Sequence, residues 1–221
     1  MPSNPTAAPI FLRDGPEDAP LALLLAHGAG APMDTPFMTD IAQGIAASGV
    51  LVVRFEFPYM RRRRETGRRS GPNGAATLRA SLTEAAAALG DRPLALGGKS
   101  MGGRYATMLA DELGAVAVVA LGYPFHPPGK PEKLRTAHLT DIQTPTLILQ
   151  GERDPFGKPE EVAGYALGDA VTVRWVPDGD HSLKPRKRSG HTEAGNRAFA
   201  VEEAAAFLAR HGARGAIGGQ E

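Results

Sequence analysis

The sequence predicts a three-layer α/β/α sandwich built on a mostly parallel β-sheet. Six short apolar runs recur along the chain, and most of them lack a polar face, as expected for parallel strands buried on both sides. Segments with apolar residues at helical spacing separate these runs, which favours an alternation of strands and helices. The runs are LALLLA (21–26), VLVVRF (50–55), PLALG (93–97), AVAVVAL (115–121), TLILQ (146–150) and VTVRWV (171–176).

Apolar spacing and glycine positions predict four helices between and after these strands. Three of them end at a glycine suited to a helix C-cap, namely Gly90, Gly114 and Gly212. A fourth helix is predicted around residues 37–47. Strands that alternate with helices in this way are typical of a parallel sheet with helices on both faces.

We expect one domain over residues 1–221, with an ordered core from about 9 to 212 and a flexible tail, GARGAIGGQE (212–221). The early segment PIFLRD (9–14) predicts an additional edge strand. The interval from 122 to 144 spans 23 residues, too few for a separately folded lid. A site at this end of the sheet should therefore be open.

Composition and charge exclude several classes of function. The formal net charge is +1, which gives no overall attraction to nucleic acid or membranes. The chain has no cysteine, so disulfides, thiolate nucleophiles and Cys-ligated metals are excluded. No signal peptide and no apolar stretch of roughly 18 residues is present. We expect a cytoplasmic protein without nucleic-acid or membrane partners, and the sequence carries no signal for an oligomeric state.

The stretch LALGGKSMGGRYA (94–106) contains a Gly-Lys-Ser triplet that fits two chemistries. A phosphate-binding loop requires the pattern G-x-x-x-x-G-K-[ST], but Pro93 occupies the position of its first glycine. The pattern G-x-S-x-G, in contrast, is complete as Gly98, Ser100 and Gly102. It lies between a strand and a helix, where small residues relieve crowding around a nucleophile. The sequence therefore favours Ser100 as a catalytic nucleophile.

A serine nucleophile requires a histidine that takes its proton and an acid that orients the histidine. On this type of sheet the chain order is serine, acid, histidine, and Ser100, Asp154 and His181 follow that order, each after a predicted strand. Because ligands bind at the carboxyl ends of parallel strands, we expect the three side chains to converge there. Asp178 and Asp180 are rival acids, but they lie so close to His181 in sequence that they are less suited to orient its ring.

An oxyanion hole should combine the backbone N–H after the nucleophile with an N–H from the loop after an earlier strand. These positions are Met101 and, within His27-Gly-Ala-Gly30, Ala29. His27 itself is interpreted as a residue that organises this loop. We assign substrate binding to residues that follow strands, namely Gly28, Gly30, Tyr123 and Arg61.

Two further basic features lie near the predicted site. Residues 60–70, MRRRRETGRRS, contain six arginines in what we expect to be a loop at the rim of the site. Such a loop would attract an anionic substrate, because guanidinium groups bind phosphate and carboxylate well. The alternative is an ordinary solvated loop. Lys99, next to the nucleophile, could pair with an acid and orient the turn.

The segments LAHGAG, FEFPYM, GGKSMGGR, LGYPFHPPGKPEKLRTAHL, GERDPFG and GDHSLKP resemble α/β-hydrolases. They are most similar to small lidless members, a family that includes dienelactone-hydrolase-like proteins and testis-expressed protein 30. The resemblance covers about residues 21–186 and implies that Ser100, Asp154 and His181 are nucleophile, acid and base. Dienelactone hydrolases use a cysteine nucleophile, so their substrate is not implied for this chain. One relative is a subunit of a chromatin-modifying assembly, so the fold alone does not imply turnover.

The sequence thus predicts a serine hydrolase of the carboxylesterase type, without a metal or cofactor. It would cleave an ester or related acyl bond in a small molecule through an acyl-enzyme intermediate. Thioesters and amides remain open as substrates, because they react through the same intermediate. The competing interpretation is a non-catalytic interaction module that uses the basic segments.

Overall fold

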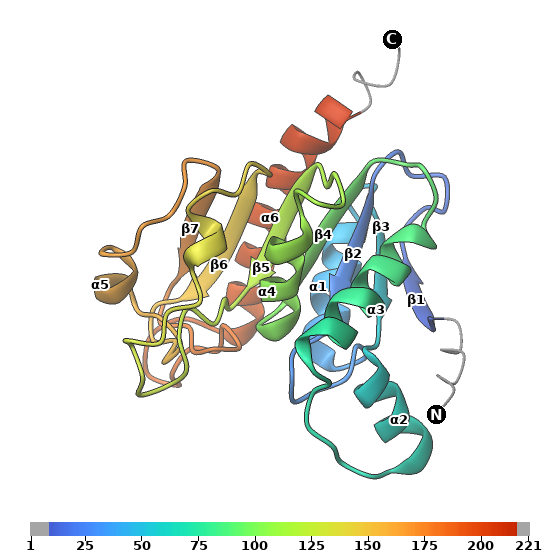
Figure 1. The fold of residues 1–221 in the computed structure, drawn as a ribbon. Helices are drawn as coiled ribbons and strands as arrows, with labels where there is room; N and C mark the ends of the chain where they lie inside the picture. The colour runs from blue at the N-terminus through green and yellow to red at the C-terminus, as the bar shows by residue number, and fades with distance from the viewer. Residues whose placement is uncertain (1–8, 216–221) are drawn as a thin grey trace.

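The structure, a computed structural model, describes residues 9–215. In this part of the chain, one seven-stranded sheet has the order β1-β3-β2-β4-β5-β6-β7 (Figure 1). Every neighbouring pair is parallel except β1 and β3, so the segment predicted as an edge strand does form one. The strands are β1 (Phe11–Asp14), β2 (Ala22–Ala26), β3 (Leu51–Phe55), β4 (Leu94–Lys99), β5 (Ala117–Leu121), β6 (Thr146–Gly151) and β7 (Val171–Val176).

Helices cover both faces of the sheet, with α3 and α4 on one side and α1 and α6 on the other (Figure 1). Each face has its own apolar core, because successive side chains of a strand point to opposite sides. In β2, Leu24 packs in the core under α3 and α4, whereas Leu23 and Leu25 pack in the core under α1 and α6. The helices are α1 (Pro36–Ala46), α2 (Pro58–Thr66), α3 (Ala75–Ala87), α4 (Met101–Leu109), α5 (Pro159–Val162) and α6 (Glu193–Gly215), with a short 3-10 helix η1 (Ala137–Leu139).

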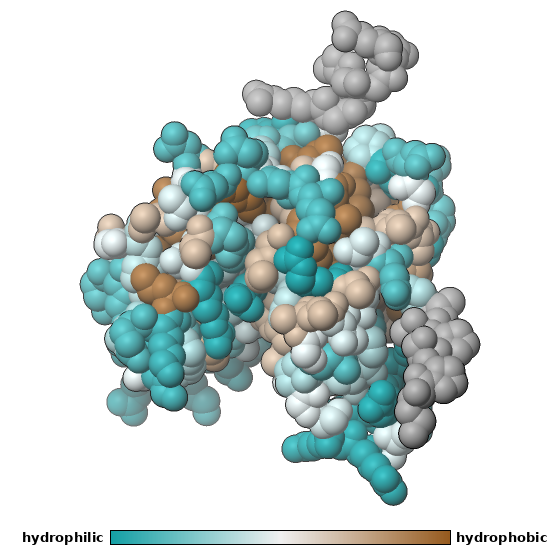
Figure 2. Space-filling view, viewed as in Figure 1, coloured by the Kyte–Doolittle hydropathy of each residue, from teal (hydrophilic) through white to brown (hydrophobic). Residues whose placement is uncertain are grey.

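All six apolar runs form strands, and the three-layer α/β/α arrangement is confirmed. The arginine segment was wrongly predicted as a loop, because residues 58–66 form the helix α2. Pro58 occupies the first turn, where proline is favoured, and the buried side chains of Tyr59 and Met60 anchor the helix. Gly67 ends it with a left-handed φ of 69°. Arginine itself is a good helix former, so the charge run continues the helix into solvent. Hydrophilic side chains project from this part of the molecule (Figure 2).

The end of α6 also differs from the prediction. Gly212 does not terminate the helix, which continues to Gly215. A Cβ at Gly212 would lie 2.6 Å from Cδ2 of Leu21, so this glycine permits close packing against the start of the sheet. Part of the predicted flexible tail is therefore helical, and its remainder, residues 216–221, lies outside the described residues.

The strand order shows at which point of the sheet a ligand site is expected. From β2 the chain moves to β3 on one side, and it then returns to β4 on the other side of β2. The loops that follow β2 and β4 therefore diverge around a crevice at their carboxyl ends, the usual ligand position in open α/β sheets. Between β5 and β6 the chain forms only η1, so no lid domain is inserted in this interval. None of the helices in the described part of the chain is long and apolar enough to cross a membrane.

Candidate active site

Ser100 lies at the sharp turn between β4 and α4. Its backbone has φ 52° and ψ −113°, a left-handed conformation that a residue with a side chain adopts only at a cost of ~1–3 kcal/mol. The glycines on either side make this turn possible. A Cβ at Gly98 would lie 2.6 Å from the carbonyl oxygen of Ala26, and one at Gly102 would lie 2.5 Å from the same atom. The turn thus presents the Ser100 side chain at the carboxyl end of the sheet.

The side chains of Ser100, His181 and Asp154 form a continuous chain of contacts. Oγ of Ser100 lies 2.8 Å from Nε2 of His181, and Nδ1 of His181 lies 2.8 Å from Oδ2 of Asp154. Because a carboxylate only accepts hydrogen bonds, Nδ1 carries the proton and Nε2 is free to accept from the serine hydroxyl. The sequence placed these residues after three different strands, and the fold brings them together.

Asp154 is fully buried, and each of its carboxylate oxygens has a donor. Oδ1 accepts from the backbone N–H of Phe156 at 2.9 Å. Oδ2 accepts from Nε2 of Gln150 at 2.9 Å, in addition to His181. Gln150 lies on β6, is itself fully buried, and also accepts at Oε1 from the backbone N–H of Tyr123 at 2.7 Å. These contacts hold the carboxylate in one orientation relative to the imidazole.

The rival acids have other partners. Asp178 accepts from the backbone N–H of Arg186 at 2.7 Å and from its guanidinium Nε at 2.8 Å. Asp180 accepts from the backbone N–H groups of Ser182 and Lys184, which closes the turn after His181. Both aspartates therefore shape the loop that carries the histidine rather than contact its ring.

Contacts from several elements also fix His181 itself. Its ring stacks on that of Phe156, with the centroids 4.1 Å apart and an angle of 29° between the planes. Asn196, at the start of α6, donates from Nδ2 to the carbonyl oxygens of Pro177 and Leu183, on either side of the histidine. Nζ of Lys99 donates to the carbonyl oxygen of His181 itself. The sequence did not identify Asn196, Gln150 or Phe156, because each acts through contacts that exist only in the folded chain.

Lys99 therefore contacts the backbone of the histidine rather than an acid. Its ammonium lies 5.9 Å from the ring centroid of Phe37, within the range of a cation–π interaction. Burial lowers the pKa of Lys99 to about 8, against the opposing effects of Asp154 and Asp180. A cation of this kind, held beside the nucleophile, links β4 to the loop of His181.

The loop after β2 lies against the nucleophile. The Cβ position of Gly28 is 3.7 Å from Cβ of Ser100. His27 is fully buried, its Nε2 accepts from the backbone N–H of Phe57 at 3.1 Å, and its Nδ1 donates to the carbonyl oxygen of Gly28 at 2.7 Å. The hydroxyl of Tyr59 donates to the carbonyl oxygen of Ala29 at 2.9 Å. Because His27 and Tyr59 donate hydrogen bonds to carbonyl groups of this loop, the backbone of residues 28–30 is fixed beside Ser100.

A pocket of about 450 Å³ opens above Ser100 and His181. It is lined by the loop of Gly28, Ala29 and Gly30 and by mostly apolar side chains. Apart from His181, Lys99 is the one ionisable side chain in the lining among the described residues. The full lining is Gly28, Ala29, Gly30, Ala31, Pro32, Thr35, Phe37, Met38, Lys99, Ser100, Phe156, His181 and Ser182.

Two residues assigned to substrate binding do not line this pocket. The ring of Tyr123 is fully buried, and its hydroxyl donates to the carbonyl oxygen of Arg135 at 2.9 Å, so it serves the packing of the segment after β5. Arg61 lies on α2, outside the pocket lining. That helix nevertheless adjoins the pocket, because NH1 of Arg63 donates to the carbonyl oxygen of Gly30 at 3.2 Å. Arg64 is paired with Glu56 at 2.6 Å and with Asp34 at 2.9 Å.

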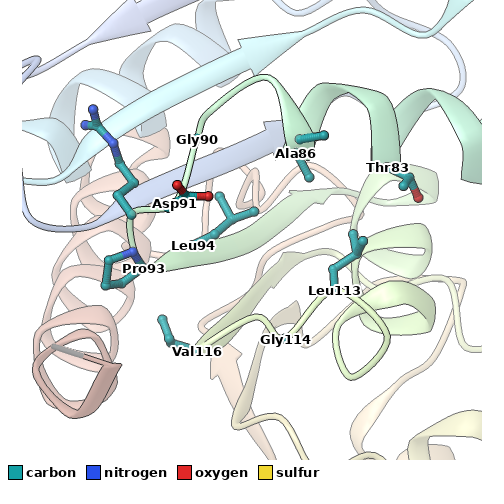
Figure 3. A pocket seen from close by; sticks show the side chains of 11 residues that line it. Thr83, Ala86, Gly90, Asp91, Pro93, Leu94, Leu113, Gly114 and Val116 are labelled. Atoms are coloured by element: carbon teal, nitrogen blue, oxygen red, sulfur yellow. The ribbon is translucent and has the colours of Figure 1, made fainter. Parts of the chain in front are cut away.

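A second hollow, of about 610 Å³, lies at the amino ends of the strands, opposite the end that carries Ser100 (Figure 3). It is formed where α3 ends and where β4 and the segment before β5 begin, around Asp91, Leu94 and Val116. The strands run away from it, so the nucleophile lies at their far ends. This hollow is therefore separate from the candidate active site.

The sequence profile of a family described as an alpha/beta hydrolase domain matches residues 19–209. The chain belongs to this family. Solved structures with the same fold include a lidless α/β serine hydrolase from Xanthomonas campestris, 21% identical with a TM-score of 0.65, which covers 95% of this chain and 97% of its own. A dienelactone hydrolase from Anabaena variabilis is 21% identical with a TM-score of 0.69, and the match covers 89% of each chain. The esterase domain of a Rhodothermus marinus protein is 19% identical with a TM-score of 0.66, over 90% of this chain and 92% of that one.

Ser100 lies at the turn between β4 and α4, Asp154 follows β6 and His181 follows β7, so the three residues keep the chain order serine, acid, histidine. Within the described residues no cluster of three or more His, Asp or Glu side chains is arranged to hold a metal ion.

Proposed function

We propose that this α/β-hydrolase is a serine hydrolase that cleaves small esters or related acyl compounds. The observation that carries the proposal is the chain of contacts from Oγ of Ser100 through His181 to the buried carboxylate of Asp154. A serine hydroxyl becomes a nucleophile when a correctly oriented imidazole accepts its proton. The strained backbone of Ser100 supports the same interpretation, because strain of this kind is retained where it presents a reacting group.

In the proposed reaction, Oγ of Ser100 attacks the carbonyl carbon while its proton moves to Nε2 of His181. The imidazolium then gives that proton to the leaving alcohol oxygen as the ester C–O bond breaks, which leaves an acyl-enzyme. Water attacks the acyl-enzyme, again losing a proton to Nε2, and the acid product leaves as Ser100 recovers its hydrogen. Asp154 keeps its charge throughout and stabilises the imidazolium.

The oxyanion of each tetrahedral intermediate requires donors close to Ser100. Met101 is the first residue of α4, where the backbone N–H has no acceptor within its own helix. The backbone of Ala29, fixed through Tyr59 and His27, lines the same pocket as Ser100. We assign these two N–H groups to the oxyanion hole.

The size and lining of the pocket favour a short or compact acyl group. Its volume of about 450 Å³ is at the lower end of the range for small-molecule sites, and no lid domain extends it between β5 and β6. The arginines of α2 lie next to the loop at Gly30 and would favour substrates with an anionic group. The same acyl-enzyme chemistry serves thioesters and amides.

The proposal is tested with p-nitrophenyl esters of increasing acyl length, from acetate to dodecanoate. We expect kcat/KM to be highest for short chains and to fall for long ones, with all activity lost in Ser100→Ala. Wild-type protein that is folded but hydrolyses none of these esters, nor the matching thioesters, above the Ser100→Ala background would overturn the proposal. The alternative, an interaction module that uses its basic segments, would then be favoured.

A further inference from the structure

Two arginines outside the pocket lie in one cluster without an acidic partner. Arg104 is on α4, one turn after the nucleophile, and its backbone N–H donates to the carbonyl oxygen of Ser100 at 3.0 Å. Arg135 lies in the segment between β5 and η1, and η1 itself packs on α4. Both side chains are partly buried. Among the side chains that the structure describes, neither guanidinium pairs with a carboxylate.

The neutral groups around the two arginines are tied together by hydrogen bonds. Nε2 of His138, on η1, lies 2.9 Å from Oγ1 of Thr107 and 3.4 Å from the hydroxyl of Tyr123. The Thr107 hydroxyl donates to the carbonyl oxygen of Arg104 at 2.8 Å, and the Tyr123 hydroxyl donates to that of Arg135 at 2.9 Å. The backbones that carry the two guanidinium groups are therefore held on either side of a Tyr-His-Thr group.

The charge of Arg104 acts on the other groups of the cluster. The pKa of Arg135 is lowered by burial and then by the charge of Arg104. Burial and Arg104 also lower the pKa of His138 to about 4, so the imidazole is neutral at pH 7. Both arginines act on Tyr123, whose pKa burial raises to about 12. The cluster thus holds two positive charges that repel each other, and no carboxylate among the described residues pairs with either of them.

One nitrogen in the cluster lacks a partner altogether. Nε of Arg104 is buried and donates no hydrogen bond within the described residues. The Arg104 guanidinium lies 5.7 Å from the ring centroid of Tyr105, which supports one face of the group. A buried donor without an acceptor and two unneutralised guanidinium charges are both unfavourable, and an anionic ligand on the remaining guanidinium nitrogens relieves the second of these costs.

We propose that Arg104 and Arg135 form a binding site for a phosphate group, beside α4 and separate from the substrate pocket. Two guanidinium groups offer forked donors that match the oxygens of a phosphate. Their combined charge is balanced by a phosphate dianion, whereas a single carboxylate balances half of it. Because Arg104 and the segment after β5 both contact the site, a bound phosphate would join that segment to α4.

The experiment follows the thermal unfolding of the whole chain in phosphate-free buffer, with inorganic phosphate as the probe. Sodium chloride is adjusted to keep the ionic strength constant. A ligand that binds only the folded state raises Tm with its concentration, by roughly 3–5 °C for each tenfold increase above the Kd. We expect this rise in the wild type and its loss in Arg104→Gln and in Arg135→Gln. Sodium succinate is run in parallel, and we expect it to give a smaller rise.

Two control variants separate this site from other basic regions. Arg62→Gln removes an exposed charge of α2, and Arg79→Gln removes one from α3, so both should keep the full response to phosphate. Without phosphate, Arg135→Gln should unfold at the same temperature as the wild type or above it, because it removes a repulsion. This second measurement keeps the proposal testable if Arg104→Gln fails to fold.

The proposal is overturned if phosphate raises the wild-type Tm no more than sodium chloride does. It is equally overturned if the response persists in both cluster variants, or if succinate matches phosphate. None of these measurements uses turnover, so their failure is distinguishable from failure of the proposed hydrolase activity.

Discussion

Gln150 Nε2 lies 2.9 Å from Oδ2 of Asp154, the same oxygen that faces Nδ1 of His181 at 2.8 Å. Oε1 of the glutamine also accepts a hydrogen bond from the backbone N–H of Tyr123, in the segment after β5. It therefore connects two neighbouring strand ends at the acid, and the orientation of Asp154 depends on it.

Gln150→Leu should lower kcat by roughly 10- to 100-fold, because small displacements of an orienting group weaken catalysis. It should also lower the free energy of unfolding by about 2 kcal/mol, since buried polar partners lose their hydrogen bonds. Ester hydrolysis and urea unfolding measure the two effects. Gln143 is exposed and its side chain donates to the nearby carbonyl oxygen of Asp141, so Gln143→Leu is the matched control and should change neither quantity. Wild-type kcat in Gln150→Leu would contradict the role assigned here.

Lys99→Met should separate activity from stability. Loss of the contact between Nζ and the carbonyl oxygen of His181 should loosen the histidine and lower kcat by roughly tenfold. Because burial lowers the pKa of Lys99 to about 8 from 10.5, the charged side chain destabilises the fold. The variant should therefore have a Tm higher than that of the wild type by roughly 2–4 °C at pH 7.

The pH dependence of this difference follows from the same shift. The charge penalty is fully present below about pH 8 and disappears as the pH rises toward 10.5, where the unfolded lysine is also neutral. Scanning calorimetry from pH 7 to 10.5 should show the two Tm values converging. Lys130→Met, at an exposed position, is the control. A Tm of Lys99→Met below that of the wild type, with kcat unchanged, would contradict both expectations for this residue.

The convergence of Ser100, Asp154 and His181 could be predicted from sequence because its signals are local. Ser100, Asp154 and His181 each follow a recognisable strand, and the parallel sheet brings strand ends together without further information. Gln150 and Asn196 could not be predicted in this way. Gln150 contacts Tyr123 and Asn196 contacts Leu183, and these partners become neighbours only after folding. A glutamine inside a strand therefore has no distinguishing pattern in the sequence.

The errors in the prediction have equally specific causes. A run of arginines has the composition of a solvated loop, and only the burial of Tyr59 and Met60 fixes it as α2. Gly212 looked like a helix end because glycine is common there, whereas here it makes room for Leu21. Tyr123 follows a strand at the correct edge, but its side chain turns into the segment after β5, which strand position alone does not reveal.

Stability should fall in mildly acidic solution because of His138. Its pKa is lowered to about 4, from 6.5, so the unfolded chain binds more protons between these values. Above pH 6.5 the imidazole is neutral in both the folded and the unfolded state, so His138 costs the fold nothing. As the pH falls from 6.5 toward 4, protonation of the unfolded state lowers the free energy of unfolding. His138→Gln keeps a donor for Thr107 without titrating, so its free energy of unfolding should depend less on pH in this window. Urea unfolding at several pH values measures how steeply the free energy of unfolding changes with pH in the wild type and in His138→Gln. An equal pH dependence in the two proteins would contradict this assignment.

The arginines of α2 should affect substrate selection rather than the chemical step. Arg61→Gln and Arg62→Gln should each raise KM for a monoester that carries a carboxylate by roughly 2- to 10-fold, with kcat unchanged. KM for a neutral ester of the same length should not change, and added salt should reduce the difference. Arg210→Gln, on α6, is the control. An equal effect on neutral and anionic esters would show that α2 does not select for charge.

The central claim is that Ser100 is a nucleophile activated by His181, and covalent labelling tests it most directly. The protein is incubated with a fluorophosphonate, and the site of modification is mapped by intact-mass and peptide mass spectrometry. We predict a single adduct on Ser100, none in Ser100→Ala, and labelling slowed by at least 100-fold in His181→Ala. Folded wild-type protein that remains unlabelled, or that carries the adduct on another serine, would contradict the claim.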